Sequence, residues 1–396
     1  MIADKVRTDA YARALRKAVG PESVVLDIGA GTGILSLLAC QYGARKVYAV
    51  EPSDAINVAR QIATDNGYAD RIEFIQALST EIDLPEKANV IVCDIRGTLV
   101  PFQQQVLSIT DARQRMLTPE GVLIPQRDSL WAAVVEAPDA YNNIVDPWEK
   151  SRFELNMNAA RRIVTNSWIR MRASAEQLLS EPRCWAVIDY TTVDSPNLDA
   201  VVRFQVTRDG IGHGLQLWFD AELIDGVGFS NAPEQPELIY GAGFFPWSSP
   251  VPLASGDTVV VRLRANLSGD EYVWSWESEV YSELTQRPKA HFRQSTFWDS
   301  PLSPERLKKR AGGHCPTLGD QGQIDKFILG RMDGLAANED IARALMSHFP
   351  SRFRSLTEAL ARTCTLSEQY SEGGAGRQYT RARRRDNDDP IKTALD

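Results

Sequence analysis

Two carboxylates flank a glycine-rich turn near the start of the chain. Asp27 stands two residues before the first glycine, and Glu51 follows the next apolar run. The glycines between them, Gly29, Gly31 and Gly33, have no Cβ, so a ligand can approach the backbone closely. An acid at the tip of the second strand can accept hydrogen bonds from both ribose hydroxyls of an adenosine. These residues predict a binding site for an adenosine cofactor.

The chemistry of the turn separates the candidate cofactors. Its glycine spacing lacks the third glycine that places a pyrophosphate at a helix N-terminus, which argues against a nicotinamide dinucleotide. Asp27 would instead pair with a free amino group. S-adenosyl-L-methionine carries such an amino group and no phosphate, so it is the predicted cofactor. The competing interpretation, a turn that merely reverses the chain, is disfavoured by the positions of Asp27 and Glu51.

The turn lies in a segment where strand and helix patterns alternate. Short apolar runs suited to strands occur at residues 24–28, 46–50, 72–76, 90–93 and 121–123. Such alternation predicts a parallel sheet, and ligands bind at the carboxyl ends of its strands. Gly29, Glu51 and Asp94 all follow such strands. We therefore expect residues 1–125 to form an α/β Rossmann-like cofactor-binding domain.

From residue 127 onward, the sequence becomes rich in strand patterns. Clusters of Gly, Asn and Asp separate these runs, as expected for an antiparallel β-barrel, which we assign to residues 126–300. Residues 139–182 interrupt the pattern with helix-like, Arg-rich segments. They form either an inserted arm or a surface excursion without a partner.

Several segments resemble the protein arginine methyltransferases. They are MIADKVRTDAYARAL, VLDIGAGTGILSLLACQYGARKVYAVEPS, VIVCDIRG, LTPEGVLIPQRDSLWAAVVEAP, WFDAEL and FSNAP, and the resemblance covers about three quarters of the chain. It implies a class I S-adenosylmethionine-dependent methyltransferase with a Rossmann-like domain and a β-barrel. It also implies a homodimer, in which the arm at residues 139–182 reaches across to the second subunit.

The resemblance implies cofactor contacts for particular residues. Arg7 would pair with the carboxylate of the cofactor, and the turn at residues 29–33 would pass beside its methionine part. Glu51 would hold the ribose. Leu78 and Ser79 would line the adenine.

The same resemblance makes Asp94 and Gln103 the candidate catalytic residues. A guanidinium is always charged, so an enzyme that methylates it must hold a cation, and two carboxylates do this best. The family places two glutamates on a hairpin after the fourth strand, and the matching residues here are Asp94 and Gln103. Asp94 is one methylene shorter than glutamate, and Gln103 is neutral with a single carbonyl acceptor. At most one of the two carboxylates that would hold the guanidinium is therefore present.

Two further family features are altered. The threonine-histidine-tryptophan motif matches Leu238, Ile239 and Tyr240, which carry no imidazole, while a rival match to AHFRQSTF would supply His291. The family's N-terminal helix folds over the bound cofactor. Because the chain begins three residues before Asp4, we expect this lid to be missing or replaced.

Composition limits the other possibilities. The net charge of −8 and pI near 5.3 argue against a nucleic-acid-binding protein. The five cysteines are scattered, with no metal-ligand spacing and no disulfide framework, which favours a reducing cytoplasm and no metal site. No signal peptide and no apolar run long enough to cross a membrane are evident. We therefore expect a soluble protein.

The C-terminal part departs from the family. Helical apolar spacing in residues 301–372 predicts a small three-helix, winged-helix-like module, which would either present a peptide to the active site or serve only as a helical cap. Residues 373–396 are rich in Arg and Gly and poor in apolar residues, so we expect a disordered tail.

These features predict a methyltransferase that acts on a nitrogen nucleophile of a protein or peptide. One alternative is a tailoring N- or O-methyltransferase for a natural product or peptide, with an acceptor other than arginine. Another is a non-catalytic scaffold that keeps the fold. The intact turn, Arg7 and Glu51 count against the scaffold, because a scaffold has no need of a cofactor site.

Overall fold

The structure is a computed structural model, and it describes residues 2–149, 155–285, 287–301 and 303–371. The described residues form two compact units, residues 2–301 and residues 303–371. The predicted tail at residues 373–396 lies outside the described residues. Within the described residues, no helix is long and apolar enough to cross a membrane.

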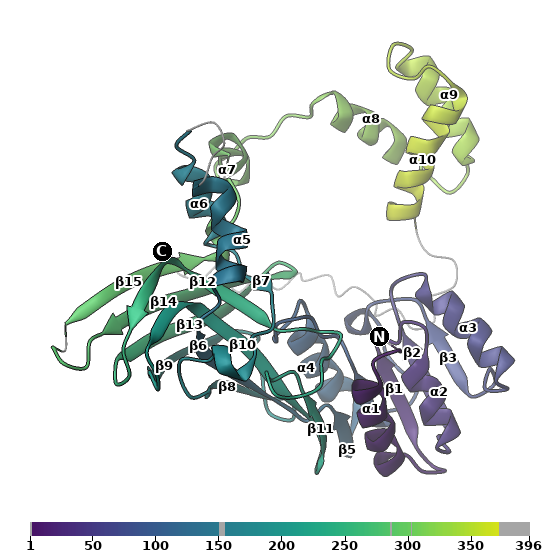
Figure 1. The fold of residues 1–396 in the computed structure, drawn as a ribbon. Coiled ribbons are helices and arrows are strands. Elements are labelled where there is room, and N and C mark those ends of the chain that lie inside the picture. Colours follow the sequence, from purple (N-terminus) through teal and green to yellow (C-terminus); the bar gives the residue numbers. More distant parts are fainter. Residues whose placement is uncertain (1, 150–154, 286, 302, 372–396) are drawn as a thin grey trace, which may run out of the picture. The chain divides into compact units, whose positions relative to one another are not determined.

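A five-stranded parallel sheet forms the first part of the larger unit (Figure 1). Its strands, in spatial order, are β3 (Ile72–Ile75), β2 (Lys46–Val50), β1 (Val24–Ile28), β4 (Ala88–Cys93) and β5 (Leu117–Ile124). Every residue of β1 is buried, which explains why the strands read as continuous apolar runs rather than as alternating patterns. The predicted Rossmann-like sheet is confirmed.

Helices flank this sheet and connect its strands. They are α1 (Lys5–Ala18), α2 (Ile34–Gln41), α3 (Ala55–Asp65) and α4 (Gln105–Met116), with a short 3-10 helix η1 (Ser79–Glu81). Asp4 caps α1 by accepting a hydrogen bond from the backbone N–H of Arg7. Its other carboxylate oxygen accepts one from the backbone N–H of Ile239 at 2.8 Å. The start of α1 is thereby tied to the segment that matches the altered family motif.

Two antiparallel sheets follow, as the strand-rich pattern predicts. The first has the order β7 (Ile169–Arg170), β12 (Gly243–Leu253), β10 (Gly210–Ile224), β6 (Arg127–Val135) and β8 (Arg183–Asp189), with β11 (Val227–Ser230) paired to β10. The second has the order β15 (Pro288–Ser295), β14 (Glu271–Tyr281), β13 (Thr258–Ser268) and β9 (Leu198–Gln205).

Buried aromatic rings join the two antiparallel sheets. Phe245 of β12 meets Trp276 of β14 edge to face, with ring centroids 5.0 Å apart, and both side chains are fully buried. Trp247 of β12 stacks on Phe292 of β15. Large rings supply much buried apolar area for each residue, so these contacts hold the sheets together.

The interruption at residues 139–182 contains a pair of helices, α5 (Pro138–Glu149) and α6 (Asn158–Val164), together with β7 and the 3-10 helix η2 (Ala175–Gln177). Figure 1 shows α5 and α6 standing out together from the antiparallel sheets. Tyr141 and Val145 anchor α5 against Val135 and Phe244. In contrast, α6 has no buried residue.

The C-terminal unit is helical. It contains α7 (Pro304–Arg310), α8 (Asp320–Leu329), α9 (Asn338–His348) and α10 (Leu356–Tyr370), and the last three share a small apolar core that includes Ile328, Leu345 and Leu366. The predicted small helical domain is confirmed. Residues 303–371 contain helices and no strand, so they show no counterpart of the wing in the predicted winged-helix-like module.

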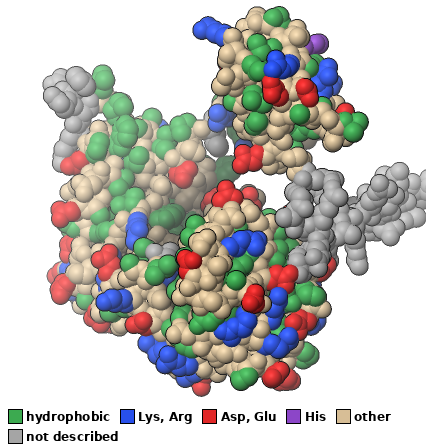
Figure 2. Space-filling model, turned by 90° about the vertical axis from the view of Figure 1, so that its right-hand side faces the viewer, with side chains coloured by type: hydrophobic (Ala, Val, Ile, Leu, Met, Phe, Trp, Pro, Cys, Tyr) green, Lys and Arg blue, Asp and Glu red, His purple; other side chains and the backbone are tan. Residues whose placement is uncertain are grey.

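Charged side chains of both signs are interspersed over the face seen in Figure 2. The described residues include exposed ion pairs, such as Arg45 with Glu86 and Arg343 with Glu339. Pairs of this kind contribute little to the free energy of unfolding.

Candidate active site

The glycine turn lies between the carboxyl ends of β1 and β2. Gly29 has a φ of 73°, and a Cβ at this position would approach Cγ1 of Ile95 to 2.9 Å. The backbone N–H groups of Gly29 and Ala30 both donate hydrogen bonds to the carbonyl oxygen of Val50, the last residue of β2. Only glycine suits this position, because the backbone is left-handed and the space is already filled.

Glu51 supports the same turn from the end of β2. One of its carboxylate oxygens accepts a hydrogen bond from the backbone N–H of Gly31 at 3.0 Å, and the other accepts one from the backbone N–H of Ser53 at 2.9 Å. Each oxygen retains a second lone pair for a ribose hydroxyl. Glu51 therefore fixes the shape of the turn as well as offering acceptors to a ligand.

A cavity of about 520 Å³ opens beside the turn. Its lining includes four of the residues predicted to bind the cofactor, Gly29, Glu51, Leu78 and Ser79, and also the candidate catalytic residue Gln103. The remaining lining residues are Ile28, Val50, Pro52, Ala77, Ile95, Gln104, Ser108 and Asp270. Apolar walls with a few polar groups are typical of a small-molecule site, and the volume suits a nucleoside-sized ligand.

Asp27 offers a test of whether an amino-bearing cofactor fits this site. Its carboxylate is buried at the end of β1, where one oxygen accepts a hydrogen bond from the hydroxyl of Ser36 at 2.6 Å. The other oxygen has no hydrogen-bond partner among the described residues. A buried acceptor without a donor is costly, and a charged amino group would satisfy it. The residues present therefore fit S-adenosylmethionine.

We expect cofactor affinity to depend on pH through Asp27. Burial raises the pKa of this carboxyl to about 6, so in the free protein it is largely protonated below that pH. Pairing with an ammonium requires the ionised form, so calorimetry should show affinity rising by up to about tenfold per pH unit between pH 5 and pH 6, then levelling above pH 7.

The Asp27→Asn variant should show a flatter pH profile of affinity. The free energy of unfolding of this variant should also depend on pH differently from that of the wild-type protein. Because the pKa in the folded protein is above the ordinary value of 3.8, the contribution of Asp27 to the free energy of unfolding falls as pH rises from about 4 to about 6, and this fall should be absent in the variant. A pH profile that is identical in both proteins would remove Asp27 from the binding site.

Asp94, the first residue after β4, is the centre of a buried polar cluster. The guanidinium of Arg7 forms an ion pair with it, and the Arg7 Nε lies 2.5 Å from Asp94 Oδ2. The hydroxyl of Tyr240 lies 2.8 Å from Oδ1 and 2.9 Å from Oδ2. Burial, then the Asp94 carboxylate, raise the pKa of Tyr240, so its hydroxyl stays protonated and donates.

Arg96 and Tyr11 complete the cluster on the other side of Asp94. The hydroxyl of Tyr11 donates to Asp94 Oδ1 at 3.0 Å, and Arg96 lies 3.3 Å from the same oxygen. Arg96 also donates two hydrogen bonds to Asp128, at 2.7 and 3.0 Å, and its side chain is fully buried. Burial opposes the charge of Arg96, but Asp128 outweighs it and the pKa of Arg96 is raised well above its ordinary value.

The structure places most of the predicted residues in two groups, and Asp27, Gly31 and Gly33 belong to neither. The cavity collects Gly29, Glu51, Leu78, Ser79 and Gln103, whereas Arg7 and Asp94 belong to the buried cluster. The sequence predicted that Arg7 contacts the carboxylate of the cofactor. In the structure, Arg7 contacts Asp94. Gln103 has a φ of 41°, a left-handed conformation that is uncommon for a side chain of this type.

Sequence reasoning missed the buried partners of Asp94. Tyr240 was noted only as the residue that replaces a family tryptophan, yet its hydroxyl bridges Asp94 and Arg7, lying 3.0 Å from the Arg7 Nε. Arg96 carried one signal, its place three residues after the end of β4. Nothing in the sequence indicates that its side chain is buried.

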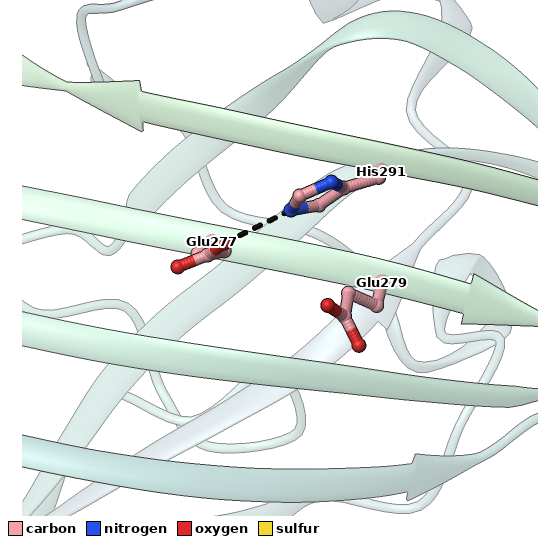
Figure 3. A group of neighbouring side chains, drawn as sticks. All are labelled: Glu277, Glu279 and His291. Atoms are coloured by element: carbon pink, nitrogen blue, oxygen red, sulfur yellow. Dashed lines mark hydrogen bonds and ion pairs between the residues drawn. The ribbon is translucent and has the colours of Figure 1, made fainter. Parts of the chain in front are cut away.

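His291 lies on β15, within the second antiparallel sheet, and its Nε2 is 2.9 Å from Glu277 Oε1 (Figure 3). Among the described residues, His291 is not part of the cavity lining, and its hydrogen bond goes to Glu277 rather than to Asp94. Glu279 lies close enough to this pair to suggest a metal site. However, Arg293 already pairs with Glu277 at 2.5 Å, so an ion pair on the sheet surface explains the group without a metal.

The chain is similar in sequence to known methyltransferases. Residues 7–137 match the family described as "Ribosomal protein L11 methyltransferase (PrmA)". A probable protein arginine N-methyltransferase 6 of Arabidopsis thaliana is 28% identical over 77% of the chain and 69% of its own length. The human protein arginine N-methyltransferase 2 is 31% identical over 67% of the chain and 66% of its own length. Across four such relatives, the chain spans between 45% and 69% of their length.

Solved structures show the same architecture. A chain from the "Trypanosoma brucei PRMT1 enzyme-prozyme heterotetrameric complex with AdoHcy" matches with a TM-score of 0.69 and 23% identity, over 74% of this chain and 96% of that one. In sequence the chain is thus similar to protein arginine N-methyltransferases, and its fold is that of the solved protein arginine methyltransferase structure.

Proposed function

We propose that the protein transfers the methyl group of S-adenosylmethionine to a nitrogen atom of an arginine side chain in a protein or peptide. The observation that carries this proposal is the cavity beside the glycine turn. It gathers residues suited to an adenosine with Gln103, next to the strand end that bears Asp94. The sequence relatives are protein arginine methyltransferases by name, which supports the same reaction.

In this proposal, the residues of the chain bind and align the two reactants. When bound, S-adenosylmethionine supplies an electrophilic methyl group. Glu51 holds the ribose, Asp27 holds the amino group, and the left-handed glycine turn allows close approach. Alignment of the acceptor nitrogen with the methyl carbon accounts for much of the rate enhancement in such a transfer.

Asp94 and Gln103 orient the acceptor. Arg7, Tyr11, Arg96 and Tyr240 hold Asp94 in one orientation at the end of β4, and Gln103 offers a carbonyl oxygen to an N–H of the acceptor. The nitrogen that gains the methyl group loses one proton, which passes to solvent through the open cavity. The acceptor side of the site thus contributes fewer negative charges than a pair of glutamates would.

The direct test is to incubate the purified protein with methyl-labelled S-adenosylmethionine, an arginine-rich peptide pool and a clarified extract. Mass spectrometry then locates the label. Label on a peptide guanidinium supports the proposal. Label on another peptide group or on a small molecule would favour the tailoring alternative, which the neutral Gln103 and the fully engaged Asp94 also support. Binding of cofactor without any transfer would favour the scaffold.

The Gln103→Glu variant tests whether the missing carboxylate limits arginine chemistry. Adding a negative charge to the cavity should raise kcat/KM for an arginine peptide by several-fold, because the acceptor is a cation. The assay should compare an arginine peptide with a citrulline peptide, which is neutral and of similar shape, and only the arginine peptide should gain. No gain with arginine would mean that the acceptor pocket differs from the family elsewhere.

We also propose that the protein is a homodimer and that it is located in the cytoplasm. The exposed helix α6, which has no buried residue, supports an arm that covers a second copy. Light scattering on the purified protein would test the dimer. The five cysteines are all free, and Cys184, Cys315 and Cys364 are exposed, which supports a reducing compartment. Cell fractionation would test that location.

A further inference from the structure

The charge balance of the Asp94 cluster leaves little attraction for a cationic acceptor. Both oxygens of Asp94 already accept hydrogen bonds from side chains of the protein, and Arg7 and Arg96 bring two positive charges. Asp94 and Asp128 bring two negative charges. Because these four charges cancel, a guanidinium entering beside Asp94 meets no excess negative charge. If the acceptor is arginine, as proposed above, its charge must be recognised elsewhere.

Only two of the described residues that line the cavity are acidic, Glu51 and Asp270. Glu51 is bound to the glycine turn through both of its oxygens and is assigned to the ribose. Asp270 is therefore the remaining carboxylate. It lies in the turn that joins β13 to β14, where Gly269 has a φ of 64°.

Contacts within the protein hold this turn at the cavity. The side-chain amide of Gln104 donates to the carboxylate of Asp270 at 3.0 Å and to the backbone carbonyl of Gly269 at 2.8 Å. Gln104 follows Gln103 directly. The segment that carries the neutral Gln103 therefore also positions Asp270, which belongs to the antiparallel sheets. Asp270 is exposed, and its carboxylate has lone pairs left after accepting from Gln104.

We propose that Asp270 recognises a positively charged side chain of the acceptor peptide at the mouth of the cavity. It would supply from the β13–β14 turn the negative charge that Gln103 lacks. This inference rests on the proposed function, because it assumes a cationic peptide as the acceptor. Asp270 acts here as a residue for specificity and positioning, and it takes no part in the transfer itself.

The Asp270→Asn variant tests this role. Asparagine has nearly the same shape, and its carbonyl oxygen can still accept from Gln104, so only the charge is lost. We expect KM for an arginine-rich peptide to rise about threefold to tenfold at about 0.02 M salt, with kcat changed less than about twofold. The increase should shrink at about 0.5 M salt, where exposed charges are screened. The affinity for S-adenosylmethionine, measured by calorimetry, should be unchanged.

Asp225→Asn is the matched control. Asp225 is also an exposed acid beside a glycine in a turn between two antiparallel strands, β10 and β11, but it does not line the cavity. This variant should keep the KM of the wild-type protein. Adding Gln103→Glu to Asp270→Asn should restore a low KM, because the charge returns to the same cavity.

An unchanged KM in Asp270→Asn would overturn the inference, and so would an increase that is equally large at low and high salt. Failure of the proposed function has a different signature: the wild-type protein would then transfer no methyl group to any arginine peptide. In that case, calorimetry with the arginine-rich peptide and S-adenosylhomocysteine decides the role of Asp270. Weaker peptide binding by Asp270→Asn supports it, and equal binding excludes it.

Discussion

Asp94→Asn should both destabilise the protein and nearly abolish methyl transfer. The substitution removes the negative charge that Arg7 and Arg96 share, and both guanidinium groups are almost fully buried. Breaking a buried ion pair at one partner typically costs about 3–5 kcal/mol in the free energy of unfolding. Under the role proposed for Asp94, which is to orient the acceptor, loss of its carboxylate should lower kcat by about 100-fold to 10,000-fold. Urea unfolding and a labelled-methyl assay would measure the two effects.

The exposed Asp199 provides a control for the loss of an acid paired with arginines. It pairs with Arg262 at 2.6 Å and with Arg264 at 3.3 Å on the second antiparallel sheet, with side chains more than one third exposed. Asp199→Asn should change the free energy of unfolding by less than about 1 kcal/mol, because solvent screens exposed pairs. Equal destabilisation by the two variants would contradict the central place of Asp94 in the buried cluster.

Glu51→Ala should weaken the binding of S-adenosylmethionine by about 1–3 kcal/mol, which corresponds to roughly fivefold to 150-fold in Kd. Two effects combine. The ribose loses its charged acceptor, and the backbone N–H of Gly31 loses the oxygen that holds it at 3.0 Å. Calorimetry with the purified protein would measure the loss.

Glu51→Gln separates these two effects. Glutamine can still accept the hydrogen bond from Gly31, so its affinity should lie between those of the wild-type protein and Glu51→Ala. Glu22→Ala, which removes an exposed acid outside the cavity lining, should leave the affinity unchanged. Unchanged binding by Glu51→Ala would remove Glu51 from the site.

Local sequence was sufficient to predict where the glycine turn and Glu51 lie in the fold. The glycine turn and Glu51 follow successive strands, so their positions are set by the strand-turn-helix order alone. Carboxyl ends of parallel strands lie at one edge of a sheet. Leu78 and Ser79, by contrast, were reached through the resemblance to a family.

Local rules do not predict the strand β12. β12 contains Pro246, Pro250 and Pro252, and proline cannot donate to a strand ladder. The structure accommodates them because the strand partner on one side, β7, is only two residues long and the pairing with β10 is irregular between Gly212 and Gly214. The prolines thus lie where few ladder hydrogen bonds are required.

The sequence by itself determined the fold class, the place of the cofactor turn and the absence of a second glutamate at Gln103, because each depends on residues close together in the chain. Tertiary structure alone decided the acceptor side. Asp94 meets Tyr240 across 146 positions, and Gln104 meets Asp270 across 166. Charge compensation depends on distances in space, so no local pattern could indicate that Arg7 and Arg96 pair with Asp94 or that Gln104 holds Asp270 at the cavity.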